Sequence, residues 1–412
     1  MMTQAEKKAS NDLLRPVSLG NEKRLPAFFV RNAVWLFYVA FALRFIGSFF
    51  EVTTFTCLLF IPKGLAIDVL DAIAVLLLLA KFLLQKTSIV GWCCAAVIVL
   101  AGFLSWRCGH ESFFFWLTLF FVCSEGVSLN TLARISITLT SFLVIITLLC
   151  SSVGAIENRI FERASGSRPA YGFAHPNYLG LYLLALAIDL VVLRIEEKPG
   201  VTVMAILAFF LLDVLFVGSR SSGAAMALLG LLFICFSRVS KSRTRRRLTM
   251  AFAVFVLLSI VGSVAVMVRY DSSLPVVNDL FRSINVALSG RLSLAHKYFE
   301  MQPLTAFGDD FSRFPPIYWE LGQPATFLVD NAYCHVLLRF GVVPFALMVT
   351  GFVLLFVDLI RKNTWNSLLL GIVVMAFVGL SEARGMHVEC NYFLIGMASE
   401  LLFSGLTASR TK

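Results

Sequence analysis

The residues best suited to chemistry in this sequence are serine and arginine side chains between two glycines. Ser219 and Arg220 belong to the run GSRSSG at 218–223, which joins two apolar stretches with almost no loop. A helix beginning at about Ser221 or Ser222 would offer free backbone N–H groups, and the neighbouring guanidinium binds phosphate or carboxylate through two parallel hydrogen bonds. The run predicts an anion site, and the competing interpretation is an ordinary tight turn between two helices.

Two other segments place polar side chains at the start of apolar stretches. His175 is followed by Pro176 and Asn177, and proline is favoured at the first position of a helix. Asp330 and Asn331 precede a later apolar stretch and are typical helix N-cap residues. We expect a structural capping role at both places, whether or not these side chains also do chemistry.

Charged residues also occur inside or at the edges of apolar stretches. Arg44 and Arg339 lie within such stretches, and Asp71 and Asp213 lie near the ends of two others. An ionisable group at bilayer depth costs roughly 2.5–3.5 kcal/mol on insertion scales, so it usually faces a partner or a cavity. These residues predict ion pairs between helices, a polar cavity at one membrane face, or both.

Composition identifies the elements that must position these side chains. Hydrophobic residues make up 58% of the 412-residue chain and charged residues 15%, whereas soluble domains carry nearer a quarter charged residues. We predict an all-α integral membrane protein with about 12 transmembrane helices and a large extracytoplasmic loop that carries short helices. The expected spans are 33–50, 65–84, 88–105, 112–123, 131–152, 176–193, 200–217, 221–237, 248–268, 333–358, 365–380 and 391–407.

Basic residues orient these spans. Alternating the spans places Lys or Arg on every cytoplasmic turn, with the densest cluster at 238–247, and leaves both termini in the cytoplasm. The fourth span is short and either extends to about residue 127 or is re-entrant. The chain then divides into a cytoplasmic segment at 1–26, helices 1–9 over 27–268 with an outer loop at 153–176, a large extracytoplasmic loop at 269–332, and helices 10–12 with a cytoplasmic tail over 333–412.

The predicted outer side contains many more arginines than lysines. Outside the spans it holds ten arginines and two lysines, a bias typical of bidentate anion binding, although chance gives a similar bias at such small numbers. Topology and anionic lipid headgroups explain the net charge of +10 better than nucleic acid does. In the large loop, 291–300 has helical patterning with Leu292, Ala295 and Phe299 on one stripe. No Cys/His spacing is typical of a metal site.

Four groups of motif residues follow one another along the predicted outer side. They are RPAYGFAHPN at 168–177, GSRSSG at 218–223, SGR at 289–291 with PLTAFG at 303–308, and DNAY at 330–333 with RFGVV at 339–343. In this order they resemble the motifs of the Wzy-type polysaccharide polymerases and the related O-antigen ligases. Each motif alone is weak, and their order and common side make the set more specific.

The resemblance implies glycosyl transfer at the outer face of a bacterial cytoplasmic membrane. A glycan on undecaprenyl diphosphate passes to an acceptor sugar hydroxyl, undecaprenyl diphosphate leaves, and neither a metal nor a cofactor takes part. Arg220 and Arg291 match the family's functional arginines and would neutralise the departing diphosphate. The expected partners are lipid-linked glycans and membrane lipids, with a chain-length regulator as a further candidate. Substrate contacts are implied at Arg168, His175, Asn177, Ser219, Asn331 and Arg339.

One position departs from the ligase pattern. Ligases tend to carry a histidine just before the span that contains Arg339, where this sequence has Asp330 and Asn331, as in repeat-unit polymerases. The general base therefore has three candidates, which are Asp330, His175 and His335. We predict a polymerase that joins lipid-linked repeat units into a surface polysaccharide such as a capsule or exopolysaccharide. The alternatives are a ligase that transfers finished glycan to a lipid or protein, and a transporter or flippase.

Overall fold

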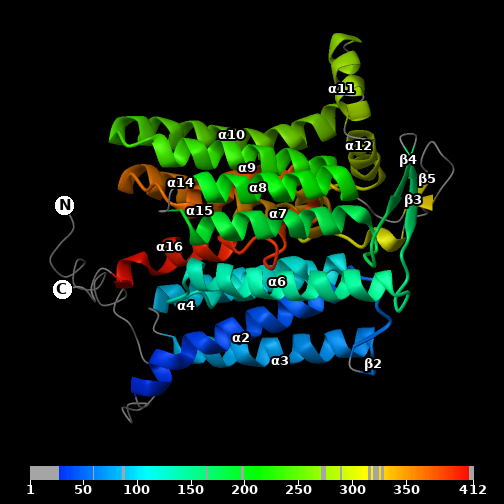
Figure 1. Ribbon diagram of the computed structural model, residues 1–412. Coiled ribbons are helices and arrows are strands. Elements are labelled where there is room, and N and C mark those ends of the chain that lie inside the picture. The colour runs from blue at the N-terminus through cyan, green and yellow to red at the C-terminus, as the bar shows by residue number, and fades with distance from the viewer. Residues whose placement is uncertain are drawn as a thin grey trace.

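The chain is an all-α helical bundle (Figure 1). The computed structural model describes residues 27–58, 60–85, 89–163, 166–195, 199–270, 275–287, 290–313, 317–318, 324–325 and 329–407. Among these residues, 8 helices are long and apolar enough to cross a membrane, so the chain is a polytopic membrane protein. They are α2 (Ala27–Glu51), α4 (Ile89–Gly109), α6 (Leu129–Ser152), α7 (Pro176–Leu193), α8 (Pro199–Leu212) with its π-helical extension η1 (Asp213–Val217), α9 (Arg220–Arg238), α10 (Ser242–Arg269) and α14 (Val342–Lys362).

Four other helices pack among these eight: α3 (Lys63–Leu84), α5 (Phe113–Val122), α15 (Ser367–Gly379) and α16 (Phe393–Thr407). The helix α5 has 10 residues, or about 15 Å, which is half the hydrocarbon thickness. It ends at Val122 and does not extend to residue 127. The structure thus supports eight spans directly, and the larger number stays a prediction.

The two ends of the bundle differ in their connections. One end, here called the basic end, holds the start of α2, the end of α16 and the basic run at 238–247, which covers the end of α9 and the start of α10 (Figure 1). The other, here called the loop end, holds the hairpins and the short helices α11 (Pro275–Ala287) and α12 (Arg291–Met301). The hairpins are β1 (Cys57–Leu58) with β2 (Ile61–Pro62), β3 (Ile160–Arg163) with β4 (Gly166–Pro169), and β5 (Ile317–Tyr318) with β6 (Pro324–Ala325).

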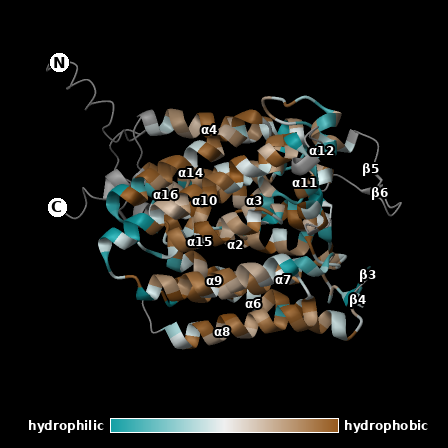
Figure 2. Ribbon diagram, turned by 90° about the horizontal axis from the view of Figure 1, so that it is seen from above, coloured by the Kyte–Doolittle hydropathy of each residue, from teal (hydrophilic) through white to brown (hydrophobic). Residues whose placement is uncertain are grey.

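Hydropathy follows the same axis. Hydrophobic residues occupy the middle of the helices and hydrophilic residues gather toward their ends (Figure 2). The helices α7 and α15 are buried on nearly all sides, whereas α4 and α8 expose large apolar side chains. Apolar side chains on the outside of a bundle are expected where lipid rather than water surrounds it.

The predicted span 333–358 is wrong as a continuous helix. The chain instead forms α13 (Ala332–His335), the π-helix η3 (Val336–Phe340) and α14, with a break at Gly341, whose φ is +93°. The loop at 305–308 fits into this break, since Val342 N–H donates to the Thr305 carbonyl at 3.0 Å. A Cβ at position 341 would lie 2.3 Å from the Gly308 nitrogen, so only glycine permits this approach. The break brings the predicted motifs at 303–308 and 339–343 into contact.

The outer loops contain more structure than their sequence suggested. The helix predicted at 291–300 exists as α12, with Leu292 and Ala295 buried, and α11 is a second short helix of this loop, whose position was not predicted; the β3–β4 hairpin was not expected. The helix α9 begins at Arg220, one residue earlier than predicted, because Gly218 ends η1 in the left-handed conformation at φ +65°. All nine cysteines lie in the described part of the chain, and each is a free thiol.

Candidate active site

A polar cavity of about 440 Å³ lies at the loop end of the bundle. Its wall carries four carboxylates, three histidines and two arginines from helices that are far apart in sequence. These residues are Glu51, Glu111, Asp330 and Glu382, then His110, His335 and His387, then Arg44 and Arg384. Three of the residues singled out in the sequence, Arg44, Asp330 and His335, therefore face the cavity directly.

Arg291 lies beside the cavity and joins two of its carboxylates. Arg291 Nε is 2.7 Å from Asp330 Oδ2, and Arg291 Nη2 is 3.5 Å from Glu382 Oε1. Arg291 is the first residue of α12, and the α11 residue Asn285 holds that helix start by accepting hydrogen bonds from two backbone N–H groups of its first turn, at 2.9 and 3.1 Å. The guanidinium is thereby fixed at the cavity wall before any ligand binds.

Asp330 and Asn331 have different roles, one forming an ion pair and the other capping a helix, which the sequence did not assign to one residue or the other. Asn331, not Asp330, caps the next helix, since its side chain accepts from Tyr333 N at 3.1 Å and Cys334 N at 3.0 Å. Its amide group also donates to Ser263 Oγ at 2.9 Å. The Asp330 carboxylate consequently pairs with a cation. Burial raises the pKa of Asp330 and Arg291 opposes that effect, so the group is a stronger proton acceptor than an ordinary aspartate.

Glu382 connects three of the predicted motif segments. Its Oε1 accepts from Asn177 Nδ2 at 3.0 Å and from Ser221 Oγ at 2.8 Å, in addition to the contact with Arg291. Burial raises the pKa of Glu382, and the positive charge of Arg291 acts in the opposite direction. Sequence reasoning missed this residue because a single acid in a short polar segment has no distinguishing spacing. Its only signal was its position in the third outer segment.

His335 and Arg339 share a second carboxylate, Glu111. His335 Nδ1 donates to the Val329 carbonyl at 3.2 Å, which turns Nε2 toward Glu111 Oε2, also at 3.2 Å. Arg339 Nε lies 3.6 Å from the same oxygen, and Arg339 Nη2 lies 3.5 Å from Asp310 Oδ1. Burial disfavours the charged carboxylate, but the neighbouring His335, His387 and Arg339 outweigh burial and lower the pKa of Glu111 to about 2. Glu111 also escaped sequence analysis.

Arg168 and His175 hold the backbone near the cavity. Arg168 Nε and Nη2 donate to the Val217 carbonyl at 3.0 and 2.8 Å, which satisfies the end of the α8–η1 helix. His175 is the N-cap of α7, and its Nδ1 accepts from Asn177 N at 3.1 Å. The predicted capping role of His175 is confirmed. The structure places both side chains beside Asn177, and their proposed contacts with substrate stay a prediction.

Ser219 and Arg220 begin α9 at the loop end. Ser219 is buried at the N-cap position, with its Oγ 3.2 Å from Ser222 Oγ. Arg220 is the first residue of the helix and is exposed. The following residue, Ser221, contacts Glu382, which also contacts Arg291. Glu382 therefore connects the start of α9, through Ser221, to Arg291, whereas Arg220 is not among the residues that line the polar cavity.

The far wall of the cavity is built from paired charges. Arg44 is 3% exposed and lies within 3.0–3.8 Å of carboxylate oxygens of Asp71, Glu51 and Glu389. Arg384 contacts Glu51 at 3.2 Å. Burial opposes the charged form of Glu389, but Arg44, His387 and Ser48 together outweigh burial and hold the pKa of Glu389 well below its usual range. The ion pairs between helices that the sequence predicted are present here.

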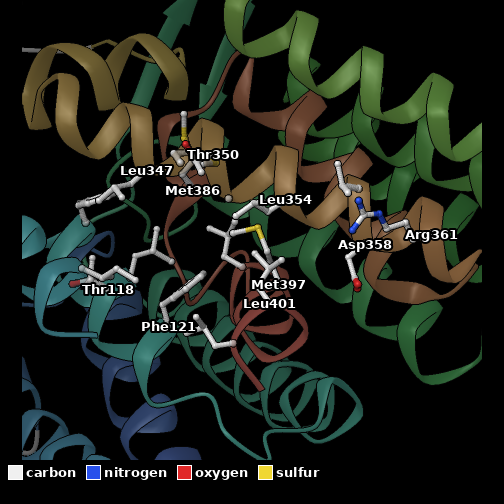
Figure 3. Close-up of a pocket in the computed structure, with 18 residues that line it drawn as sticks. Thr118, Phe121, Leu347, Thr350, Leu354, Asp358, Arg361, Met386, Met397 and Leu401 are labelled. Atoms are coloured by element: carbon white, nitrogen blue, oxygen red, sulfur yellow. The ribbon is translucent and has the colours of Figure 1, made fainter. Parts of the chain in front are cut away.

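An apolar pocket of about 410 Å³ lies between α5, α14 and α16. Figure 3 shows Leu354, Met397 and Leu401 around this pocket, with Asp358 and Arg361 at its far end. The polar cavity and the apolar pocket are separated by two pairs of residues that are adjacent in the sequence. Phe113 and His387 line the polar cavity, where their rings stack 4.5 Å apart, whereas Phe114 and Met386 line the apolar pocket. An amphiphile therefore has a polar and an apolar site side by side.

Comparison with known proteins identifies no relative: no family model, no curated protein and no solved structure matches this chain. In the part of the chain that the structure describes, no group of three His, Cys, Asp or Glu residues is arranged to hold a metal ion. The polar cavity is instead built from guanidinium, imidazole and carboxylate groups, which bind anions, position hydroxyls and transfer protons.

Proposed function

We propose that the protein is a polysaccharide polymerase that joins repeat units carried on undecaprenyl diphosphate. The observation that carries the proposal is the convergence at the loop end. Asn177, Ser221, Arg291 and Asp330 come from four separate motif segments; the first three contact Glu382, Arg291 also pairs with Asp330, and both carboxylates line one polar cavity. An apolar pocket adjoins that cavity and suits the isoprenoid part of such a substrate.

The proposed reaction exchanges one carbon–oxygen bond for another. The acceptor hydroxyl oxygen forms a bond to the anomeric carbon of the donor sugar, and the bond from that carbon to the diphosphate breaks. The diphosphate leaves with the bonding electron pair, and Arg220 and Arg291 stabilise its developing charge. Asp330 accepts the hydroxyl proton, since its carboxylate lies at the cavity wall 2.7 Å from Arg291. No step requires an oxidant or a reductant.

Donor binding would also prepare the base. Arg291 Nε now lies against Asp330, and a bound diphosphate would draw the guanidinium toward itself. Asp330, whose side chain is partly buried, would then lose part of its compensating positive charge, and both effects favour uptake of a proton. In this proposal the loop end faces the outside of the cytoplasmic membrane. The basic end faces the cytoplasm, as the positive-inside rule requires.

A specific observation favours one second candidate, an O-antigen-ligase-like transfer of finished glycan. His335 lines the cavity and is oriented by Val329 and Glu111, although it lies outside the position where ligases usually carry their histidine. The two functions share donor chemistry and differ in product. Without a polymerase, single lipid-linked repeat units accumulate, whereas without a ligase long polymer forms and stays on undecaprenyl diphosphate.

The proposal is tested with Arg220→Ala and Arg291→Ala in a host whose surface polysaccharide depends on this chain. Each variant should lower polymer formation by roughly 10²–10³-fold, as removal of one transition-state donor does, while single lipid-linked units accumulate. Arg159→Ala is the matched control, because Arg159 is also at the loop end but is half exposed and pairs with Glu157 at 2.9 Å. Normal chain length in both active-site variants, at normal protein level, would exclude the proposed function.

A further inference from the structure

One oxygen atom of Glu382 receives three donors from three different helices. Asn177 Nδ2 lies 3.0 Å from Glu382 Oε1, Ser221 Oγ lies 2.8 Å from it, and Arg291 Nη2 lies 3.5 Å from it. Surface carboxylates seldom collect three convergent donors, but phosphate oxygens in binding sites commonly do. The arrangement resembles an occupied anion site whose occupant belongs to the protein itself.

The electrostatic surroundings strengthen this interpretation. Asn177 is the second residue of α7, Ser221 is the second residue of α9, and Arg291 is the first residue of α12. Side chains from the first turns of three helices, where the helix dipole is positive, therefore meet at one atom, and the backbone N–H groups of a first turn have no partner within their own helix. The exposed Arg220 adds a further positive charge at the start of α9.

The Glu382 side chain is also placed so that a ligand can replace it. It is 14% exposed and lines the wall of the polar cavity, while Asp330, a like charge, faces it across Arg291. The segment that carries Glu382 precedes the short 3-10 helix η4 (Ala383–Met386) and is not held within a long helix. Two like charges repel strongly at contact distance, so a diphosphate and the Glu382 carboxylate cannot both occupy this position.

We propose that Asn177, Ser221 and Arg291 form a binding site for a diphosphate oxygen, and that Glu382 Oε1 occupies this site until the ligand displaces it. This inference rests on the proposed function, because it identifies where the donor's diphosphate binds. It adds Ser221 to the binding residues and assigns Glu382 as an internal competitor. Removing the Glu382 charge therefore strengthens anion binding, whereas a purely structural glutamate would give the opposite result when removed.

The test measures binding of inorganic diphosphate to the purified full-length protein in detergent by calorimetry. Glu382→Ala and Glu382→Gln should each bind about tenfold more tightly than the unsubstituted protein, a cautious estimate for the loss of one like charge at contact distance in a partly solvated site. Glutamine has the shape of glutamate, so it keeps the fold if alanine does not. Glu157→Gln is the control, since Glu157 is an exposed glutamate at the loop end that pairs with Arg159 and does not line the cavity, and it should change the dissociation constant by less than about twofold.

The donors are tested in the Glu382→Gln background. There Ser221→Ala and Asn177→Ala should each reverse most of the gain, because each removes one of the convergent donors. Unchanged or weaker diphosphate binding in both Glu382 variants would overturn the proposal, as would an equal gain from Glu157→Gln. Tighter binding in the Glu382 variants together with normal polymer from Arg291→Ala would support the anion site and exclude the polymerase function, so the two failures are distinguishable.

Discussion

The polar cavity and the apolar pocket lie on opposite sides of the same two chain segments, yet they are built in different ways. Around the polar cavity, charged groups are held by named partners, such as Arg291 by Asp330 and Glu382. The apolar pocket is lined by flexible side chains, among them Met348, Met386 and Met397. Fixed polar groups recognise one geometry, whereas methionine adapts to many apolar shapes. The difference suits a substrate with a defined headgroup and a long, featureless tail.

The largest effect on stability is expected when a buried charge is removed from the wall of the polar cavity. Arg44→Met removes the buried cation that compensates Asp71, Glu51 and Glu389 and should destabilise the fold by about 3–5 kcal/mol, as removing one member of a buried ion cluster does. The measurement is the yield and thermal midpoint of the purified protein in detergent. Arg159→Met is the control, because its exposed ion pair is worth less than about 1 kcal/mol. Equal stability of the two variants would show that the wall is not structural.

A smaller effect is expected from filling the apolar pocket. A Cβ at Gly351 would lie 3.4 Å from Met397 Cε, a flexible group that can yield, so Gly351→Phe places its ring in the pocket without a backbone clash. Polymer formation should fall about tenfold through a higher Michaelis constant for the lipid-linked substrate, because uniform binding energy is lost. Val353→Phe, at a half-exposed site on the same helix that is not among the residues lining the pocket, should leave the rate unchanged.

An unchanged Michaelis constant in a folded Gly351→Phe protein would show that the apolar pocket does not bind the lipid-linked substrate. A lower turnover with an unchanged Michaelis constant would also contradict the comparison, since it would place the pocket's effect on the chemical step. The thermal midpoint of the purified variant, measured beside that of Val353→Phe, shows whether the added ring disturbs the fold.

The smallest effect concerns the pH dependence of the polar wall. The folded pKa of Glu111 is about 2, below its ordinary 4.5, so the stabilisation is complete above pH 4.5 and is lost as the pH falls toward 2. Since 32% of the side chain is exposed, we expect only about 1–2 kcal/mol. Thermal midpoints between pH 7 and pH 3 should fall less steeply in Glu111→Gln than in the unsubstituted protein. Glu157→Gln, an exposed control, should follow the unsubstituted protein, and parallel profiles for all three would contradict the assignment.

Several features of the fold could be predicted because they depend on residues close together in the sequence. Long apolar runs predicted the helices, the start of α7 with His175 as its cap was correct, and the stripe of Leu292 and Ala295 predicted α12. The Gly-Ser run at 218–223 correctly marked a tight connection. Each of these rests on backbone hydrogen bonding or on the helical repeat, which act over a few residues.

Other features required the tertiary structure. Asp330 and Asn331 are both good cap residues, and only the approach of Arg291 from α12 decides which one forms an ion pair. The break at Gly341 depends on the loop at 305–308, more than 30 residues earlier in the chain.

The sequence by itself determined a membrane-spanning helical bundle and the order of its polar segments, because hydropathy and helix signals are local. It also pointed to Arg220 and Arg291. Only the tertiary structure decided that Glu382 contacts side chains from three of the predicted segments, and that Glu111 pairs with His335 and Arg339. A carboxylate carries no spacing signal of its own. Its role follows from which helices pack beside it, and packing joins residues that are hundreds of positions apart.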